Sequence, residues 1–384
     1  MRLKSFWCFL GLFFCLLLAG APGKARAEEE TVSGENGPSA AAAQVLRLSA
    51  DAQAAGGLAA ADLTGNGLVD GADAQALLLH GAGLLNDTTA LAGILSDSLL
   101  GEKYLEKFSY NGPVREGNNY RSENVSVTVA RVSEEIGGKA VTYYLADIYL
   151  RNLACFRTAF AKDAYGKIEH VERTAANNEA IVAISGDYYS ARSRGLVIRN
   201  GELYRKSLAR DRDVCVLYRD GTMETYLANS VDVEEILARD PYQSWGFGPE
   251  LLDADGMPKD EFNTKVAARN PRSAIGYYEP GHYCFLVVDG RQKGYSYGIN
   301  MENLSRLFYE LGCSVAYNLD GGATAVMANE SGMLNRQTDT DRLCSDILYI
   351  IDTDERLVLQ PVPEDAADSE DAAEPKTEEG EQGE

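Results

Sequence analysis

The chain has 384 residues, of which 45% are hydrophobic and 24% charged, so it holds enough apolar material for a sizeable globular core. Its formal net charge is −22, with 36 basic against 58 acidic side chains. An acidic surface repels a phosphate backbone, which argues against general nucleic-acid binding. A site for an anionic substrate must therefore be a local cluster of arginines and backbone amides.

The first 27 residues have the features of a signal peptide. Arg2 and Lys4 give a positive start, an apolar run follows over 6–18, and Ala25-Arg26-Ala27 fits a small-x-small cleavage site. The apolar run is too short for a comfortable membrane span, and an uncleaved N-terminal anchor is the alternative. Both interpretations predict a secreted or cell-surface protein, and no later stretch is long and apolar enough to cross a bilayer.

The cysteines that follow the predicted signal peptide do not have the spacing of a disulfide framework or a zinc ribbon. They are odd in number, widely spaced and without a C-x-x-C pair: Cys155, Cys215, Cys284, Cys313 and Cys344. We expect buried free thiols, with one bridge left open. The only histidines are His80, His170 and His282, and their scatter argues against a two-metal phosphodiesterase.

A calcium-binding loop is predicted near the N-terminus, after a linker at 28–42. Oxygen ligands fall at loop positions 1, 3, 5, 7 and 12, where the seventh is a backbone carbonyl and Gly67 makes the turn: Asp62, Thr64, Asn66, Leu68 and Asp73. An apolar helix is expected over 74–79. The motif Ala-Asp-Ala-Gln-Ala at 72–76 repeats the one at 50–54.

This segment, 43–95, resembles a dockerin module, in which two such loop-helix units bind Ca²⁺ and dock to a cohesin. The first loop would begin at Ala40 and supply no carboxylate before Asp51. One calcium site and a cohesin-type partner are therefore what the resemblance implies, and a small helical spacer that binds nothing is the alternative.

The segment 96–352 is predicted to be one α+β domain, with a mixed β-sheet and few helices. Alternating or continuous apolar runs indicate strands, and two Asn-Gly or Asp-Gly turns indicate hairpins, within 125–132, 142–150, 180–184, 196–203, 214–226, 284–288, 315–319 and 344–351. The best helix is Met301–Leu311, with Asn300 as its cap and Gly312 at its end. The segment 353–384 is acidic and is expected to be disordered.

Three of these predicted strands end in an aspartate that is next to a glycine. Asp187, Asp289 and Asp320 follow the strands near 184, 288 and 319. Glycines let a ligand approach the backbone, although an Asp-Gly pair after a strand is more often a plain turn. Several arginines in the same domain favour a site for an anion: Arg272, Arg291, Arg336 and Arg342.

Taken in order, these motifs resemble the phosphodiester glycosidase family, which includes the mannose 6-phosphate uncovering enzyme. The similarity extends over about 100–352 and lies in Gly186-Asp187-Tyr188-Tyr189, Phe247-Gly248-Pro249, Arg272-Ser273-Ala274-Ile275-Gly276, Val287-Val288-Asp289-Gly290-Arg291, Ser296-Tyr297-Gly298, Asn318-Leu319-Asp320-Gly321-Gly322 and Asn335-Arg336. The chain departs from the family at Asp187, where many members have glycine, and at Ala323.

The resemblance implies hydrolysis of a sugar-1-phosphodiester at the anomeric carbon, for example in N-acetylglucosamine-1-phosphodiester or a cell-surface glycan. A carboxylate is needed for the attacking water or the oxocarbenium charge, and arginines and amides stabilise the phosphate. We expect Asp289 and Asp320 to be catalytic together with Arg291. The expected substrate-binding residues are Arg272, Asp187, Ser296, Asn318, Gly321, Gly322, Thr324, Arg336 and Arg342.

Two other functions remain open from the sequence. The strand-end aspartates of a non-catalytic surface module would bind glycan or cell-wall polymer without turnover. A metal-dependent phosphodiesterase would act on the same substrate but cut the P–O bond. For Arg272 and Arg342, a structural ion pair is the alternative to phosphate binding.

Overall fold

The computed structural model describes residues 62–65, 68–86, 91–96, 98–262, 264–339 and 341–357. Every described residue belongs to one compact unit, which spans 38–384. The predicted signal peptide, linker, first dockerin-like loop, calcium ligand Asn66 and the tail beyond 357 lie outside the described residues.

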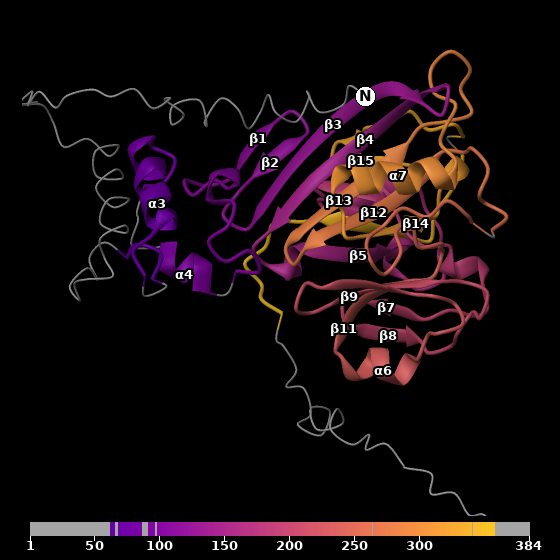
Figure 1. Ribbon diagram of the computed structural model, residues 1–384, viewed down its shortest axis with the longest axis horizontal. Coiled ribbons are helices and arrows are strands. Elements are labelled where there is room, and N and C mark those ends of the chain that lie inside the picture. The colour runs from indigo at the N-terminus through magenta and orange to yellow at the C-terminus, as the bar shows by residue number, and fades with distance from the viewer. Residues whose placement is uncertain are drawn as a thin grey trace, which may run out of the picture. The chain divides into compact units, whose positions relative to one another are not determined.

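A seven-stranded sheet forms the centre of the domain (Figure 1). Its strand order is β1-β2-β3-β4-β13-β12-β14. The strands are β1 (Val114–Glu116), β2 (Asn119–Arg121), β3 (Val125–Ile136), β4 (Lys139–Leu150), β13 (His282–Val288), β12 (Arg272–Glu279) and β14 (Val315–Leu319).

A second sheet of five strands has the order β16-β15-β6-β17-β5, and two smaller sheets have the orders β10-β9-β11 and β7-β8. Their bounds are β5 (Phe156–Phe160), β6 (Val182–Ser185), β7 (Val197–Arg199), β8 (Glu202–Arg205), β9 (Val214–Tyr218), β10 (Met223–Tyr226), β11 (Pro241–Trp245), β15 (Met327–Asn329), β16 (Gly332–Met333) and β17 (Asp346–Ile350).

The domain is mostly β-sheet with few helices, as expected, but its sheets are not mixed. Every ladder between the described strands is antiparallel. The prediction of a mixed sheet was therefore wrong. Apolar patterning shows that a strand is buried but does not show which strand pairs with it or in which direction.

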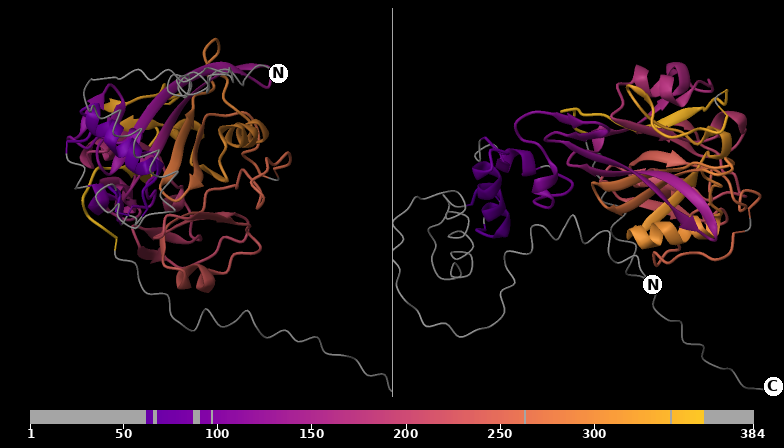
Figure 2. Two further views of the ribbon diagram at one scale, coloured as in Figure 1. Left: turned by 60° about the vertical axis from the view of Figure 1, so that its left-hand side comes forward. Right: turned by 90° about the horizontal axis from the view of Figure 1, so that it is seen from above.

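Two helices cover the outer faces of the two packed sheets. Cys284, Leu286 and Val288 of β13 point to one side and pack with α7 (Met301–Leu311). The alternate residues Phe285 and Val287 face the five-stranded sheet in a shared core. The far side of that second sheet packs against α5 (Val171–Asn177). The views in Figure 2 show α7 along the face of the larger sheet.

Helix α7 confirms its predicted bounds and caps. The side chain of Asn300 accepts a hydrogen bond from the Asn303 amide at 3.3 Å, and Gly312 ends the helix at φ 86°. A left-handed residue at this position favours glycine, because a Cβ there is strained. The buried face consists of Met301, Leu304, Ser305, Leu307 and Phe308.

The predicted strands are present, most with shifted ends. The Asn200-Gly201 turn joins β7 to β8 with φ of 52° and 83° at its two residues, and Asp220-Gly221 joins β9 to β10. Seven strands had not been predicted: β1, β2, β5, β11, β12, β15 and β16. Their segments are short or lack a clear alternation of apolar residues.

The remaining helices are short. They are α3 (Gly71–Gly81), α4 (Leu91–Ser96) and α6 (Val233–Ala238), with 3₁₀ turns at Leu105–Lys107, Leu153–Cys155, Ala161–Asp163, Tyr189–Ala191 and Gly322–Thr324. The predicted helix at 74–79 lies within α3, but the described residues do not establish a paired dockerin module. Among them, no helix has both the length and the apolar character of a membrane span.

Candidate functional site

The candidate site lies at one edge of the seven-stranded sheet. Strands β13 and β14 both pair antiparallel with β12, so they run in the same direction and end at the same edge. Asp289 follows β13 and Asp320 follows β14, while Arg272 begins β12 between them. Two strand spacings, roughly 10 Å, separate the two aspartate positions.

Asp320 is the carboxylate of this edge that faces a cleft. Its side chain is only 6% exposed, and its Oδ2 has no hydrogen-bond partner among the described residues. Burial raises the pKa of Asp320 to about 7, with Asp187 acting in the same direction and Thr324, Arg342 and Arg192 opposing it. The group therefore exchanges its proton near neutral pH, as a catalytic acid or base does.

Asp320 lies at the boundary of two adjoining depressions of about 790 and 360 Å³. Both depressions are also lined by Phe247, Val266 and Arg342, so we treat them as one cleft. The larger depression adds Tyr188, Arg192, Asp211, Arg212, Thr264 and Lys265. The smaller adds Asn270, Arg272, Arg291, Gly321, Gly322, Ala323 and Asp339.

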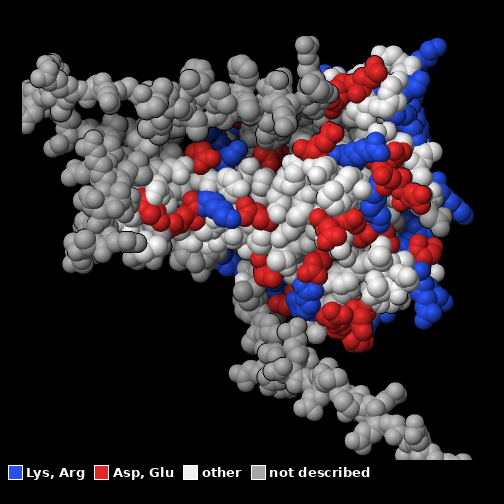
Figure 3. All heavy atoms as spheres, viewed as in Figure 1, with Lys and Arg blue, Asp and Glu red and all other residues white. Residues whose placement is uncertain are grey.

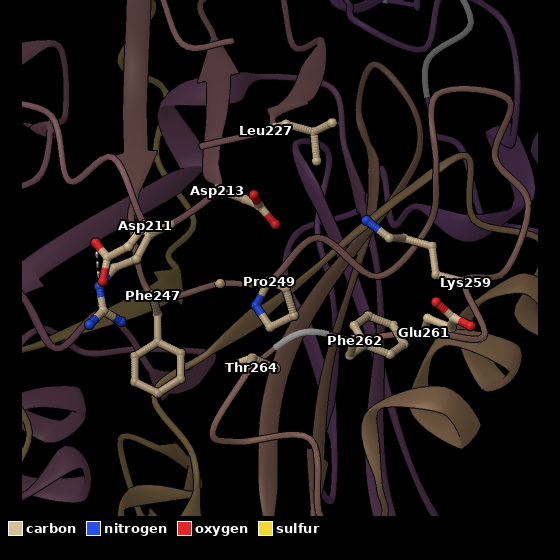
Figure 4. Close-up of a pocket in the computed structure, with 11 residues that line it drawn as sticks. Asp211, Asp213, Leu227, Phe247, Pro249, Lys259, Glu261, Phe262 and Thr264 are labelled. Atoms are coloured by element: carbon tan, nitrogen blue, oxygen red, sulfur yellow. Dashed lines mark ion pairs between the residues drawn. The ribbon is translucent and has the colours of Figure 1, made fainter. Parts of the chain in front are cut away.

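A third depression of about 330 Å³ continues the cleft past Phe247 and Thr264 (Figure 4). Asp213, Pro249 and Lys259 lie around it, and Leu227 and Phe262 give it apolar walls. The Lys259 ammonium pairs with the buried Glu250 carboxylate at 2.7 Å, so its charge is compensated. This end of the cleft is therefore less cationic than the part around Asp320.

The arginines around Asp320 are not compensated in this way. No carboxylate that the structure describes forms an ion pair within 4 Å with any of four arginines in the cleft: Arg192, Arg272, Arg291 and Arg342. On the face in Figure 3, by contrast, acidic and basic side chains are interspersed. Unpaired guanidinium groups in a chain with a net charge of −22 point to an anionic ligand.

Asp289 has a different environment from Asp320. Its carboxylate accepts hydrogen bonds from Asn335 Nδ2 at 2.7 Å, from the Tyr295 hydroxyl at 2.8 Å and from the Arg336 amide at 3.2 Å. It is 1% exposed, and burial raises its pKa while these donors oppose the rise. The structure thus places Asp289 behind the cleft, where it holds the loop after β13.

A buried ion-pair network surrounds Asp187, which directly precedes the cleft residue Tyr188. The guanidinium of Arg199 bonds Asp346 Oδ2 through Nε at 2.8 Å and lies 3.7 Å from Asp187 Oδ2. Asp346 Oδ1 accepts the Asp187 amide at 2.7 Å, and Asp187 Oδ2 accepts the Gly246 amide at 2.9 Å. Burial raises the pKa of Asp346 to about 6. Asp187 is therefore a supporting residue in this geometry.

The predicted arginines divide between the cleft and its surroundings. Arg272 lines the cleft, but it is buried and donates to the carbonyls of Val266, Ala268 and Ile299, and burial lowers its pKa to about 10. Arg272 forms no ion pair with a described carboxylate, so the alternative of a structural ion pair is not what the structure shows for this residue. Arg291 bonds Asn270 Oδ1 and Arg342 packs over Tyr188, and both line the cleft.

Arg336 and Ser296 lie on the Asp289 side. The Arg336 guanidinium packs over the Tyr295 ring at 5.1 Å, and its carbonyl accepts from Gln292. Ser296 is fully buried, accepts the Thr142 amide at 3.0 Å and donates to the Asp289 carbonyl at 2.5 Å. The structure gives both residues contacts that hold the loop after β13.

The segment after β14 brings the backbone close to the cleft. Gly321 and Gly322 line it, and Gly322 has φ 64°, where a Cβ would also lie 3.3 Å from Arg291. Thr324 donates to the Gly321 carbonyl at 2.6 Å and stabilises this turn. Asn318 is buried and donates to the Gly248 carbonyl at 2.8 Å, which fixes the segment that contains Phe247.

Sequence reasoning missed Arg192, Arg212, Lys265 and Phe247 as lining residues of the cleft. Arg192 donates to the Gly246 carbonyl at 2.9 Å, and its guanidinium lies 5.0 Å from the Phe247 ring. The nearby motif at 186–189 was the available indication for Arg192. Arg212 and Lys265 lie in loops that only the folded chain brings to the cleft.

The predicted calcium loop is partly described. The Asp73 side chain is completely buried and accepts the Leu63 and Asp70 amides at 2.7 and 2.8 Å. The Thr64 hydroxyl is also buried and has no partner among the described residues. Among the described residues, those of this loop included, no group of three or more His, Cys, Asp or Glu side chains could hold a metal.

Comparison with known proteins gives a consistent result. Residues 178–351 match the phosphodiester glycosidase (NAGPA) family model. The SPbeta prophage-derived uncharacterized protein YomE of Bacillus subtilis (strain 168) is 32% identical over 201 residues, which are 49% of this chain and 31% of the relative. The chain thus spans about a third of that relative's length.

The fold is similar to a solved structure from zebrafish. It is the catalytic domain of N-acetylglucosamine-1-phosphodiester alpha-N-acetylglucosaminidase, auto-inhibited by its pro-peptide. The two share 19% identity with a TM-score of 0.50, over 60% of this chain and 84% of that one. The matched family segment contains the cleft arginines and Asp320.

Proposed function

We propose that this chain, whose residues 178–351 match the phosphodiester glycosidase family model, is a member of that family and an exported hydrolase of sugar-1-phosphodiesters. It cleaves at the anomeric carbon and gives a free sugar and a phosphomonoester. N-acetylglucosamine-1-phosphodiesters and cell-surface glycan phosphodiesters are the proposed substrates. The observation that supports this most is Asp320, a buried carboxylate close to several arginines. Within the described parts of the chain, one of its oxygens has no hydrogen-bond partner and those arginines have no carboxylate partner.

The proposed chemistry needs charge stabilisation more than proton donation. A phosphate monoester is a weak base, so it leaves without a strong general acid, but its negative charge must be stabilised. Arg291 and Arg342 and the amides near Gly322 are suited to that task, because charged donors in a partly dry cleft bind phosphate oxygens strongly.

Asp320 is the proposed nucleophile or general base. As a carboxylate it either attacks the anomeric carbon or removes a proton from the attacking water, and it stabilises oxocarbenium charge in both cases. Asp289 is proposed to position the loop that contains Arg291, since its carboxylate accepts all its hydrogen bonds from that loop and from 335–336. We propose a similar positioning role for five other predicted site residues: Asp187, Ser296, Asn318, Thr324 and Arg336.

The test is turnover by the full-length chain of UDP-N-acetylglucosamine and a panel of glycosyl phosphodiesters. The proposal expects free reducing sugar and phosphomonoester in equal amounts, and at least a hundredfold lower rate for Asp320→Asn. Binding of these compounds without release of sugar, in the presence and absence of chelator, would support a non-catalytic glycan-binding module instead.

Calcium binding by the loop at 62–73 is a separate proposal. The buried Asp73 carboxylate and Thr64 hydroxyl are hard oxygen donors of the kind that Ca²⁺ prefers. Calorimetric titration should show one Ca²⁺ bound per chain and none in Asp73→Ala, with Asp255→Ala as the control. Equal binding by both variants would contradict the assignment. A cohesin-type partner stays a prediction from the sequence.

A further inference from the structure

The cleft has cationic side chains on both sides of Asp320, which is more than one phosphodiester requires. We name the two parts by their members. The glycine side consists of Asn270, Arg272, Arg291, Gly321 and Gly322, and the tyrosine side consists of Tyr188, Arg192, Arg212 and Lys265. Asp320 and Arg342 line both parts.

The tyrosine side has three cations, and the carboxylate of Asp211 also lines this depression. Arg212 approaches Asp211 only loosely, at 3.7 Å between Nε and Oδ1, and the Asp211 side chain is 77% exposed. Arg192 is turned into the cleft wall, where it packs against Tyr188 and Phe247 and bonds a carbonyl instead of a carboxylate. Burial lowers the pKa of the Arg192 guanidinium, and the nearby carboxylates of Asp187 and Asp320 oppose the fall.

A single phosphodiester carries one negative charge and occupies one side of the reacting carbon. If Asp320 acts at that carbon and the phosphate binds on one cationic side, the other cationic side is left for the sugar that contains this carbon. The second cationic side then faces the sugar itself. This holds whichever side receives the scissile phosphate.

Building on the proposed function, we infer that the preferred substrate has a second anionic group on the sugar that is released, in addition to the scissile phosphodiester. That group is a carboxylate, as in a uronic acid, or a further phosphate, as in a polymer of repeating sugar phosphodiester units. Neutral sugars fit the same cleft but leave one cationic side unmatched.

The experiment compares three methyl phosphodiesters of the same sugar 1-phosphate with the full-length chain. The first sugar is neutral, the second has a phosphate at C6, and the third has a C6 carboxylate. The wild type should show at least a tenfold higher kcat/KM for one or both charged sugars, and the preference should shrink in 0.5 M NaCl because salt screens exposed charges. The more favoured of the two identifies the anion.

Variants then locate the effect. The double variant Arg212→Gln/Lys265→Gln changes the tyrosine side, and Arg291→Gln changes the glycine side. One of them should lower the preference for the charged sugar severalfold, while the other lowers kcat/KM for all three substrates by a similar factor. Lys162→Gln/Lys167→Gln removes two exposed charges that do not line the cleft and controls for net charge.

Equal kcat/KM for the three substrates in the wild type, or an equal loss for all three in both cleft variants, overturns the inference and leaves the proposed function intact. If no substrate is turned over, calorimetry of the same compounds separates the two ideas. Tighter binding of the charged sugars then supports two anion subsites without the glycosidase activity. No difference in binding contradicts both.

Discussion

The backbone amide of Asp320 donates a hydrogen bond to the carbonyl oxygen of Gly186 at 2.9 Å. This contact joins the end of β14 in the seven-stranded sheet to the end of β6 in the five-stranded sheet. The hydroxyl of Ser185 reinforces it by donating to the Asp320 carbonyl at 2.9 Å. The carboxylate is therefore held at the junction of the two sheets, where the cleft opens.

Replacing Asp320 by Asn should remove the activity and leave the fold intact. Asn has the same shape but cannot accept a proton or form a glycosyl ester, so kcat should fall by about 10²–10⁴. Asp339→Asn, which changes an exposed carboxylate at the rim of the same cleft, should have less than a tenfold effect. Steady-state kinetics and circular dichroism of both variants test this, and comparable losses would count against the role of Asp320.

The same substitution should stabilise the protein at high pH. The pKa of Asp320 in the fold, about 7, exceeds the ordinary value of 3.8, so folding costs free energy once pH rises above 3.8, and the whole cost is present above 7. Asn at 320 avoids that cost. At pH 8 we expect a gain of roughly 2–4 kcal/mol, since one pKa unit is worth about 1.36 kcal/mol.

Urea unfolding at several pH values measures this difference. The gain of Asp320→Asn over the wild type should shrink steadily as the pH falls from 7 towards 4. A variant that is less stable than the wild type at pH 8 would show that the carboxylate is stabilised by its surroundings instead of penalised by them.

The pH dependence of kcat/KM should report the proton on Asp320. A nucleophile or base must be ionised, so kcat/KM should rise with pH through an apparent pKa near 7. Arg342 lowers that pKa, so Arg342→Gln should move the rising limb to higher pH. A limb that falls through pH 7 would assign Asp320 as a general acid. If the rising limb stays at the same pH in Arg342→Gln, Arg342 does not influence the pKa of Asp320.

Asp289 should prove more important for stability than for the chemical step. Asp289→Ala leaves the buried donors of Asn335, Tyr295 and Arg336 without their acceptor, and each such loss costs about 1–3 kcal/mol. The free energy of unfolding should fall by roughly 2–5 kcal/mol on this basis. Chemical unfolding and the kcat of the folded fraction test this together. Full stability with abolished kcat would instead make Asp289 catalytic.

The sequence alone predicts the regular parts of this domain well. Helix α7 and strand β14 have the expected bounds because strong amphipathic or apolar runs are bordered by Asn300, Gly312 and Asp320. The Asn200-Gly201 hairpin follows from the positive φ that both residues tolerate. These features depend on local chemistry, which a single sequence contains.

The different environments of Asp289 and Asp320 could not be predicted in this way. Asp289 and Asp320 both follow a buried strand and precede a glycine, yet one is saturated by donors and the other faces the cleft. The difference arises from Asn335 and Tyr295, which reach Asp289 through the loops. Arg212 likewise comes to the cleft only through the antiparallel packing of the sheets, which apolar periodicity does not specify.

The most direct test of the central claim is turnover in water enriched in oxygen-18, with a glycosyl phosphodiester that the full-length chain accepts. Mass spectrometry of the two products shows which bond was cut. The account predicts the label at the anomeric carbon of the released sugar and none in the phosphomonoester. Label in the phosphate would mean cleavage of the P–O bond and would contradict a glycosidase built around Asp320.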